Sequence, residues 1–224
     1  MRANVRRGGA PGGSGVGNRD HVVLVHGLWM HGMAMQVMAH LLGRRGYRVH
    51  RVSYDFLRRS PAESADKLAG EIAALGPDPV HLVGHSLGGI VILHLLDRHP
   101  ESAVASCVLI GSPVRGSGVA RQVHGNPLLR PLLGRSIEGG LLGGAPEIDG
   151  RCPIGMITGR GRFGIASLLY PVEGEGDGVV AESETLLENV TDRITLPRSH
   201  SALIFSRRCA KQVAHFIENG RFDA

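Results

Sequence analysis

The chain has 224 residues, enough for one domain with a sizeable hydrophobic core. Its hydrophobic content of 42% and charged content of 20% are ordinary for a globular protein. The net charge is +5, but the basic residues are scattered beyond the N-terminus and no nucleic-acid-reading motif accompanies them, which argues against a nucleic-acid partner. No run approaches the ~18 consecutive apolar residues of a membrane span, so we expect no transmembrane segment.

Residues 1–19 are rich in glycine and arginine and contain no hydrophobic run. A secretory signal needs an apolar core of roughly 7–15 residues, so this segment is expected to be a disordered tail. Residues 20–224 would then form the folded domain. With no signal for export, a cytoplasmic location is expected.

The three cysteines, Cys107, Cys152 and Cys209, are widely spaced and form no CxxC pair. This pattern is typical of free thiols in a reducing compartment and not of a disulfide framework. No histidine or cysteine spacing matches a zinc site, since a strand-to-turn boundary separates His81 from His85. We therefore expect no metal and no cofactor.

Apolar runs and helical periodicity alternate along the chain from residue 21 onward. A short, nearly continuous apolar run indicates a buried strand, whereas apolar residues three and four apart indicate a helix. Glycine and proline mark most of the boundaries. In chain order the expected elements are strand 21–26, helix 33–42, strand 47–54, helix 61–75, strand 80–83, helix 87–98, strand 105–110, strand 153–158, helix 182–189, strand 193–196 and helix 206–218. Such alternation predicts an α/β fold with a mostly parallel, six-stranded, doubly wound sheet.

Residues 114–150 interrupt this alternation with many glycines, paired leucines and two prolines, Pro127 and Pro131. Two interpretations of this segment remain open. It is either a short lid-like insertion that lines a binding pocket or a loop whose leucines complete the core. Under the first interpretation, Leu128 and Leu132 are candidate pocket residues.

The segment Gly84-His85-Ser86-Leu87-Gly88 fits the pattern G-x-S-x-G, directly between an expected strand and an expected helix. The pattern alone is a weak signal, but this position makes it a strong one. A nucleophilic serine needs a sharp, strained turn, and glycine on either side avoids clashes with neighbouring backbone. The start of the helix also directs free N–H groups toward a developing oxyanion. Ser86 is therefore the candidate nucleophile.

A His-Gly-Leu-Trp motif at 26–29 follows the first expected strand. Together with the Gly-His-Ser-Leu-Gly-Gly turn, a later Asp-Gly-Val-Val segment and a late Ser-His-Ser, it makes residues 20–220 resemble the α/β-hydrolase family. The resemblance implies a minimal α/β-hydrolase fold. It also implies an oxyanion hole formed by the backbone N–H groups of Leu28 and Leu87. His26 is interpreted as a structural residue that holds its own loop.

Members of this family carry their catalytic residues in the chain order Ser, then Asp or Glu, then His. His200 lies in a loop after the last expected strand, whereas His215 lies inside the final expected helix, so His200 is the candidate base. Asp177 lies in a Gly-Asp-Gly-Val-Val turn that resembles the acid turn of bacterial lipases, and it is the candidate acid. Glu175 remains open as the alternative acid. Other carboxylates in this stretch are Glu173 and Glu182.

Together these residues predict a serine hydrolase that cleaves carboxylic esters through an acyl-enzyme on Ser86. The compact size resembles that of small bacterial lipases and esterases, which implies a small-molecule ester with a lipophilic acyl group, a lipid being one option. Trp29 and His31 are further candidates for the substrate pocket. Two alternatives remain open, namely an acyltransferase that uses the same three residues and a non-catalytic ligand-binding protein of the same fold.

Overall fold

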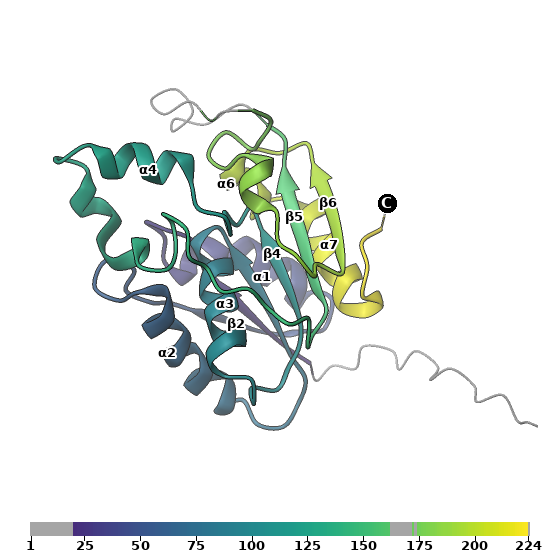
Figure 1. The fold of residues 1–224 in the computed structure, drawn as a ribbon. Helices are drawn as coiled ribbons and strands as arrows, with labels where there is room; N and C mark the ends of the chain where they lie inside the picture. Colours follow the sequence, from purple (N-terminus) through teal and green to yellow (C-terminus); the bar gives the residue numbers. More distant parts are fainter. Residues whose placement is uncertain (1–19, 162–171, 173, 224) are drawn as a thin grey trace, which may run out of the picture.

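The computed structural model describes residues 20–161, 172 and 174–223, and a six-stranded sheet forms its centre (Figure 1). The strands lie in the order β2-β1-β3-β4-β5-β6, and every neighbouring pair is parallel. Their bounds are β1 (His21–Val25), β2 (Arg48–Val52), β3 (Val80–His85), β4 (Val104–Ile110), β5 (Ile154–Gly159) and β6 (Asp192–Leu196). The predicted α/β fold with a parallel, six-stranded sheet is confirmed. The tail expected at 1–19 lies outside the described residues.

Helices cover both faces of this sheet. The longer helices are α1 (Gln36–Gly43), α2 (Pro61–Ala73), α3 (Leu87–Arg98), α4 (Gly118–Gly125) and α7 (Arg207–Asn219). Shorter helical segments are η1 (Gly32–Met35), η2 (Arg130–Ile137), η3 (Glu182–Thr185) and α6 (His200–Leu203). Helices α2 and α3 pack together over one face, and α1 and α7 pack together over the other. Among the described residues, no helix is both long and apolar enough to cross a membrane.

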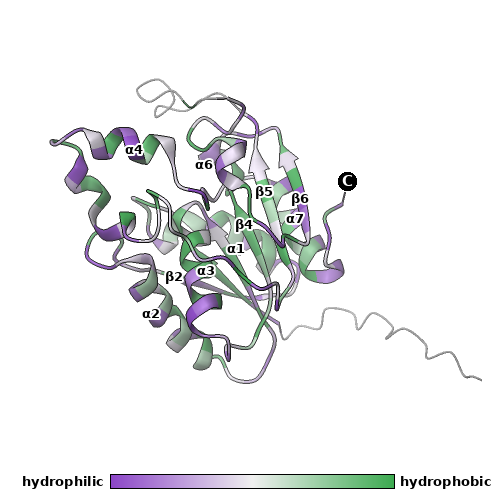
Figure 2. Ribbon diagram, in the orientation of Figure 1, coloured by the Kyte–Doolittle hydropathy of each residue, from purple (hydrophilic) through white to green (hydrophobic). Residues whose placement is uncertain are grey.

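Alternate residues of the central strands contribute to two separate cores. In β1, Val23 and Val25 join the core beneath α2 and α3, whereas Val22 and Leu24 join the core beneath α1 and α7. Every residue of β1, β3 and β5 is buried, because helices cover the sheet on both sides. Figure 2 shows the result, with hydrophobic strands in the centre and hydrophilic residues on the outer surfaces of the helices.

The segment between β4 and β5 contains α4 and η2 and lies beyond the carboxyl end of the sheet (Figure 1). It contacts the loop after β2 at Gly134, where an added Cβ would lie 2.4 Å from Leu57 Cα. The next residue, Arg135, donates its backbone N–H to Leu57 O at 3.1 Å. Its guanidinium pairs with Glu63 in the first turn of α2 at 2.7 Å. These contacts attach the insertion to the side of the molecule formed by α2.

Two local predictions were wrong. The helix expected at 182–189 is only the single turn η3, which ends at Thr185. Arg193 donates to Thr185 O at 3.2 Å, so an arginine side chain bonds to a carbonyl that a helix over 182–189 would have used. The next carbonyl, Leu186 O, accepts from Arg115 at 2.8 Å. The loop expected around His200 is in fact the start of α6. A helix of four residues is too short to show periodicity in the sequence.

Candidate active site

Ser86 occupies the sharp turn between β3 and α3, with φ 54° and ψ −121°. A non-glycine residue with positive φ is strained, and such strain is concentrated at functional sites. Two flanking glycines make the turn sterically feasible. An added Cβ would lie 2.6 Å from Gly89 N at Gly84 and 2.2 Å from Val25 O at Gly88. The predicted reason for both glycines, crowding by neighbouring backbone, therefore agrees with the geometry.

His200 and Asp177 form a buried pair close to this turn. The Nδ1 of His200 lies 2.7 Å from Oδ2 of Asp177, and the backbone N–H of His200 donates to Asp177 O at 2.9 Å. The other carboxylate oxygen of Asp177 accepts N–H bonds from Val179 at 3.0 Å and Val180 at 2.8 Å. The carboxylate is only 2% exposed, so these partners replace its water. The pairing favours a proton on Nδ1 of His200 and leaves Nε2 as the basic nitrogen.

The residues considered as alternatives to Asp177 and His200 have other partners. Glu175 forms an ion pair with Arg160 at 2.6 Å, and its side chain is 65% exposed. Glu182 pairs with the same arginine at 3.3 Å, and Glu173 lies outside the described residues. His215 bonds through Nδ1 to Arg221 O at 2.8 Å on the final helix. The geometry therefore favours Asp177 and His200 over each alternative that is described.

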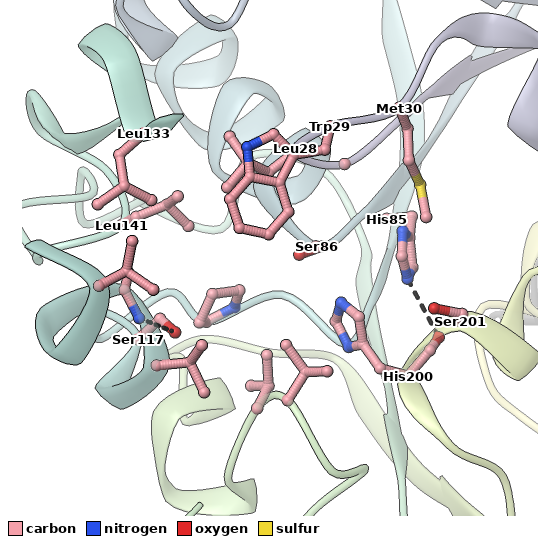
Figure 3. A pocket seen from close by; sticks show the side chains of 17 residues that line it. Leu28, Trp29, Met30, His85, Ser86, Ser117, Leu133, Leu141, His200 and Ser201 are labelled. Atoms are coloured by element: carbon pink, nitrogen blue, oxygen red, sulfur yellow. Dashed lines mark hydrogen bonds between the residues drawn. The ribbon is translucent and has the colours of Figure 1, made fainter. Parts of the chain in front are cut away.

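Figure 3 shows Ser86 and His200 projecting toward the same open space. Both residues line one cavity of about 270 Å³. Gly111, which follows β4 with φ 56°, makes room for the His200–Asp177 pair, since an added Cβ there would lie 3.1 Å from Asp177 Oδ2 and 3.2 Å from His200 Nδ1. The arrangement places a hydroxyl and a carboxylate-supported imidazole at a common site, as nucleophilic catalysis requires.

His85 is a residue whose position the sequence analysis did not single out. Its ring lies against that of His200, with the centroids 4.6 Å apart, and its Nε2 donates to His200 O at 3.2 Å (Figure 3). Burial, and then the neighbouring His200, hold the pKa of His85 well below its ordinary value. A neutral His85 adds no positive charge beside the base. The only sequence signal for it was its place directly before Ser86.

The motif at 26–29 lies directly beside the serine. An added Cβ at Gly27 would lie 3.0 Å from Ser86 Cβ, so the backbone that leads to Leu28 passes close to the serine. On the other side, Leu87 is the first residue of α3. His26 holds the loop as interpreted, because its Nδ1 donates to Gly27 O at 2.8 Å and Tyr54 Oη donates to His26 O at 2.7 Å. Burial lowers the pKa of His26, so this ring is also neutral near pH 7.

Of the residues named as pocket candidates, Trp29 lines the cavity and three do not. His31 lies in a separate hollow beside Tyr54, Leu128 is 88% exposed, and Leu132 is 49% exposed. The leucines of the insertion that line the cavity are Leu133 and Leu141, both nearly fully buried and both part of the core beneath α2 and α3. Further lining residues that the sequence analysis missed are Met30, Val119, Ala120, Val123, Val179 and Val180.

The amino-acid sequence is similar to those of known hydrolases. The sequence profile of the alpha/beta hydrolase family matches residues 22–193. A pimeloyl-[acyl-carrier protein] methyl ester esterase of Aeromonas hydrophila is 36% identical over 102 residues, which are 43% of this chain and 40% of that protein. The chain thus matches about two fifths of the length of this curated relative.

Two solved structures share the fold at low sequence identity. The mature lipase BlEst2 of Bacillus licheniformis superimposes with a TM-score of 0.74 at 21% identity, covering 89% of this chain and 91% of the lipase. The metagenomic carboxyl esterase MGS0156 gives a TM-score of 0.69 at 18% identity, covering 95% and 82% of the two chains. The family profile spans the sheet from β1 into β6 and includes the turn at Ser86. On this match, the chain belongs to the alpha/beta hydrolase family.

Proposed function

We propose that this protein hydrolyses carboxylic esters with a lipophilic acyl group, through an acyl-enzyme on Ser86. One observation carries the proposal. Ser86, on its strained turn, and His200, which pairs with the buried Asp177, line a single cavity whose other walls are mostly apolar. Ester hydrolysis is also the activity named for the esterase of Aeromonas hydrophila, whose sequence the chain matches in part.

The mechanism follows from the roles that these groups are suited to take. Ser86 Oγ attacks the ester carbonyl carbon while Nε2 of His200 accepts its proton. Asp177 holds the imidazole orientation and stabilises the imidazolium that forms. The proton on Nε2 then passes to the departing alcohol, and an acyl-enzyme remains on Ser86. Water, deprotonated by the same His200, attacks the acyl-enzyme and releases the acid.

The negative charge of the tetrahedral intermediate needs donors close to Ser86. The backbone N–H groups of Leu28 and Leu87 are the proposed donors, because they belong to the two segments that meet beside the serine. One donor of this kind stabilises the transition state by about 3 kcal/mol. The dipole at the start of α3 acts in the same direction.

The cavity supports a lipophilic acyl group. Of the described residues that line it, none is Lys, Arg, Asp or Glu, and Leu133, Leu141 and Val123 are nearly fully buried. A charged acyl group would lose its hydration there without gaining a partner. The volume of about 270 Å³ lies near the lower end of the range for ligand pockets, ~300 to 1,000 Å³, so we expect short to medium acyl chains to fit best.

The test is hydrolysis of p-nitrophenyl acyl esters, from short to long chains, by the wild type, Ser86→Ala and the matched control Ser102→Ala. Ser102 lies in the turn between α3 and β4, away from the cavity. We expect loss of several orders of magnitude in kcat for S86A and wild-type rates for S102A. An added alcohol acceptor distinguishes hydrolysis from acyl transfer, because a transferase would divert product from the free acid. Equal activity of the wild type and S86A would reject the proposal.

A further inference from the structure

Two of the three cysteines lie side by side in the core although 45 positions separate them in the chain. Cys107 lies in β4 and Cys152 lies in a bend just before β5, and their sulfur atoms are 3.9 Å apart. Both belong to the core beneath α2 and α3. Cys209 lies in α7 and belongs to the opposite core. The contact could not be predicted from the spacing of the cysteines, because the two residues come together only when β4 pairs with β5.

We propose that Cys107 and Cys152 are an oxidation site, at which a peroxide converts the two thiols to an intrachain disulfide. Both cysteines are free thiols in this structure. The proposal concerns a pair that takes no part in the ester chemistry, since neither residue lines the cavity at Ser86. It therefore stands independently of the proposed function.

The two thiols have different environments, which gives them different roles. Cys107 is fully buried, whereas Cys152 is 7% exposed and follows the exposed Arg151. The hydrogen bond from Cys107, together with the positive charge of Arg151, lowers the pKa of the Cys152 thiol, while burial raises the pKa of Cys107. Cys152 is thus the thiol that ionises first and that a small oxidant reaches first.

The chemistry requires only a peroxide as co-reactant. The Cys152 thiolate attacks one peroxide oxygen, the O–O bond breaks, and Cys152 becomes a sulfenic acid with release of one water. The Cys107 sulfur then attacks the Cys152 sulfur, the S–O bond breaks, and a second water leaves with the thiol proton of Cys107. Two thiols are oxidised by two electrons and one hydrogen peroxide is reduced to two waters.

The geometry requires a modest movement. A disulfide has an S–S distance of about 2.05 Å, so the two sulfurs must approach by roughly 2 Å. Cys107 is fixed in β4, where its N–H donates to Pro153 O at 2.9 Å. Cys152 precedes β5 and belongs to a stretch, 146–153, that has neither helix nor strand. We expect the approach to come from the side of Cys152.

A disulfide at this place would close a loop that contains the whole insertion between β4 and β5. Cross-linking removes conformational freedom from the unfolded chain, and closing a loop of this length substantially stabilises the folded state. We expect a rise in Tm on the order of 5–10 °C after oxidation, lost again on reduction. Because the cavity residues are not modified, kcat/KM for an ester substrate should stay within about twofold of the reduced protein.

The experiment treats the whole chain with a small excess of hydrogen peroxide and then quantifies thiols in denaturant, maps the peptides by mass spectrometry and measures Tm. The expected result is loss of two thiols, a peptide cross-linked between Cys107 and Cys152, and reversal by dithiothreitol. Cys209→Ala serves as the matched control and should show the same cross-link and the same rise in Tm on oxidation as the wild type. Cys152→Ser, at the more exposed position, should fold and show neither cross-link nor rise in Tm.

Three outcomes would overturn the proposal. The first is retention of all three thiols in folded protein at peroxide concentrations that oxidise a free thiol peptide. The second is oxidation of Cys152 to a sulfinic acid without a cross-link. The third is a disulfide that includes Cys209 or that joins two chains.

Discussion

The indole Nε1 of Trp29 donates a hydrogen bond to the carbonyl oxygen of Leu132 at 2.9 Å, which joins the loop beside Ser86 to the insertion. Trp29 also has φ 56°, an uncommon value for a large side chain, and Figure 3 shows its ring above the cavity near Leu28. The strained backbone directs the indole toward the insertion. Trp29 therefore links the loop of the proposed oxyanion donor, Leu28, to the part of the insertion directly before the cavity-lining Leu133.

Replacing Trp29 by phenylalanine should test this link, because the smaller side chain is still aromatic but has no N–H donor. A single neutral hydrogen bond contributes about 1 kcal/mol, so we expect kcat/KM to fall roughly fivefold. Steady-state kinetics with one p-nitrophenyl ester measures the change. Val37→Ala, an exposed apolar residue of α1, should leave the kinetics unchanged. Wild-type kinetics for W29F would show that the hydrogen bond has no functional role.

The cavity wall offers a second prediction, at Leu133. This side chain is 1% exposed and lines the cavity, so Leu133→Ala should enlarge the space for the acyl chain. We expect the preferred ester to lengthen by about one to three methylene groups, and the free energy of unfolding to fall by about 2–4 kcal/mol. The chain-length series and chemical denaturation measure the two effects. Leu128→Ala, at 88% exposure, is the matched control and should change neither. An unchanged chain-length preference in folded L133A would show that Leu133 does not limit the length of the acyl chain.

The contrast between Leu128 and Leu133 shows where sequence patterns stop being informative. The strands and the turn at Ser86 depend on local patterns, such as apolar runs and flanking glycines, and these were visible in the sequence. Leu133, which lines the cavity, directly precedes the bend at Gly134, where φ is 53° and the backbone passes too close to Leu57 for a side chain. That contact joins segments 77 positions apart, and no local pattern encodes it.

The three proposed catalytic residues also lie in local motifs. Ser86 and His200 were named because each lies in a short motif directly after an expected strand, and parallel strands bring these ends to one edge of the sheet. Asp177 was named for its Gly-Asp-Gly-Val-Val turn, which lies further along the chain from the expected strand 153–158. The packing of His85 on His200 and the contact between Cys107 and Cys152 have no such motif. They follow from strand order and register, which the sequence alone left undetermined.

The choice of acid residue leads to a third prediction. Asp177→Asn should keep the shape of the side chain, while its amide presents N–H to Nδ1 of His200 and favours the wrong imidazole tautomer. We expect kcat to fall by about 10⁴-fold with little change in KM. Glu175→Gln removes a carboxylate that pairs with Arg160 at the surface, and it should leave kcat within about twofold. A large loss in E175Q with near-normal activity in D177N would reverse the assignment.

Buried histidines give the last prediction, on the pH dependence of stability. Burial lowers the pKa values of His26, His81 and His85 in the folded protein, whereas each would have a pKa near 6.5 when the chain unfolds. Below about pH 6.5 the unfolded chain therefore binds protons that the folded chain does not. By linkage, the free energy of unfolding should be highest above pH 7 and should fall as the pH drops from 6.5 toward 5.

His85 has the largest role in this fall, because burial and the neighbouring His200 hold its pKa well below the ordinary value. One such histidine contributes a slope of up to about 1.4 kcal/mol per pH unit below its unfolded pKa. Urea denaturation at pH 7.5, 6.5 and 5.5 measures the slope in the wild type and in His85→Gln, whose amide can still donate to His200 O. We expect a smaller slope in H85Q, and His215→Gln, on the partly exposed side of α7, should keep the wild-type slope. Identical slopes in the wild type and H85Q would mean that His85 is not held neutral by burial.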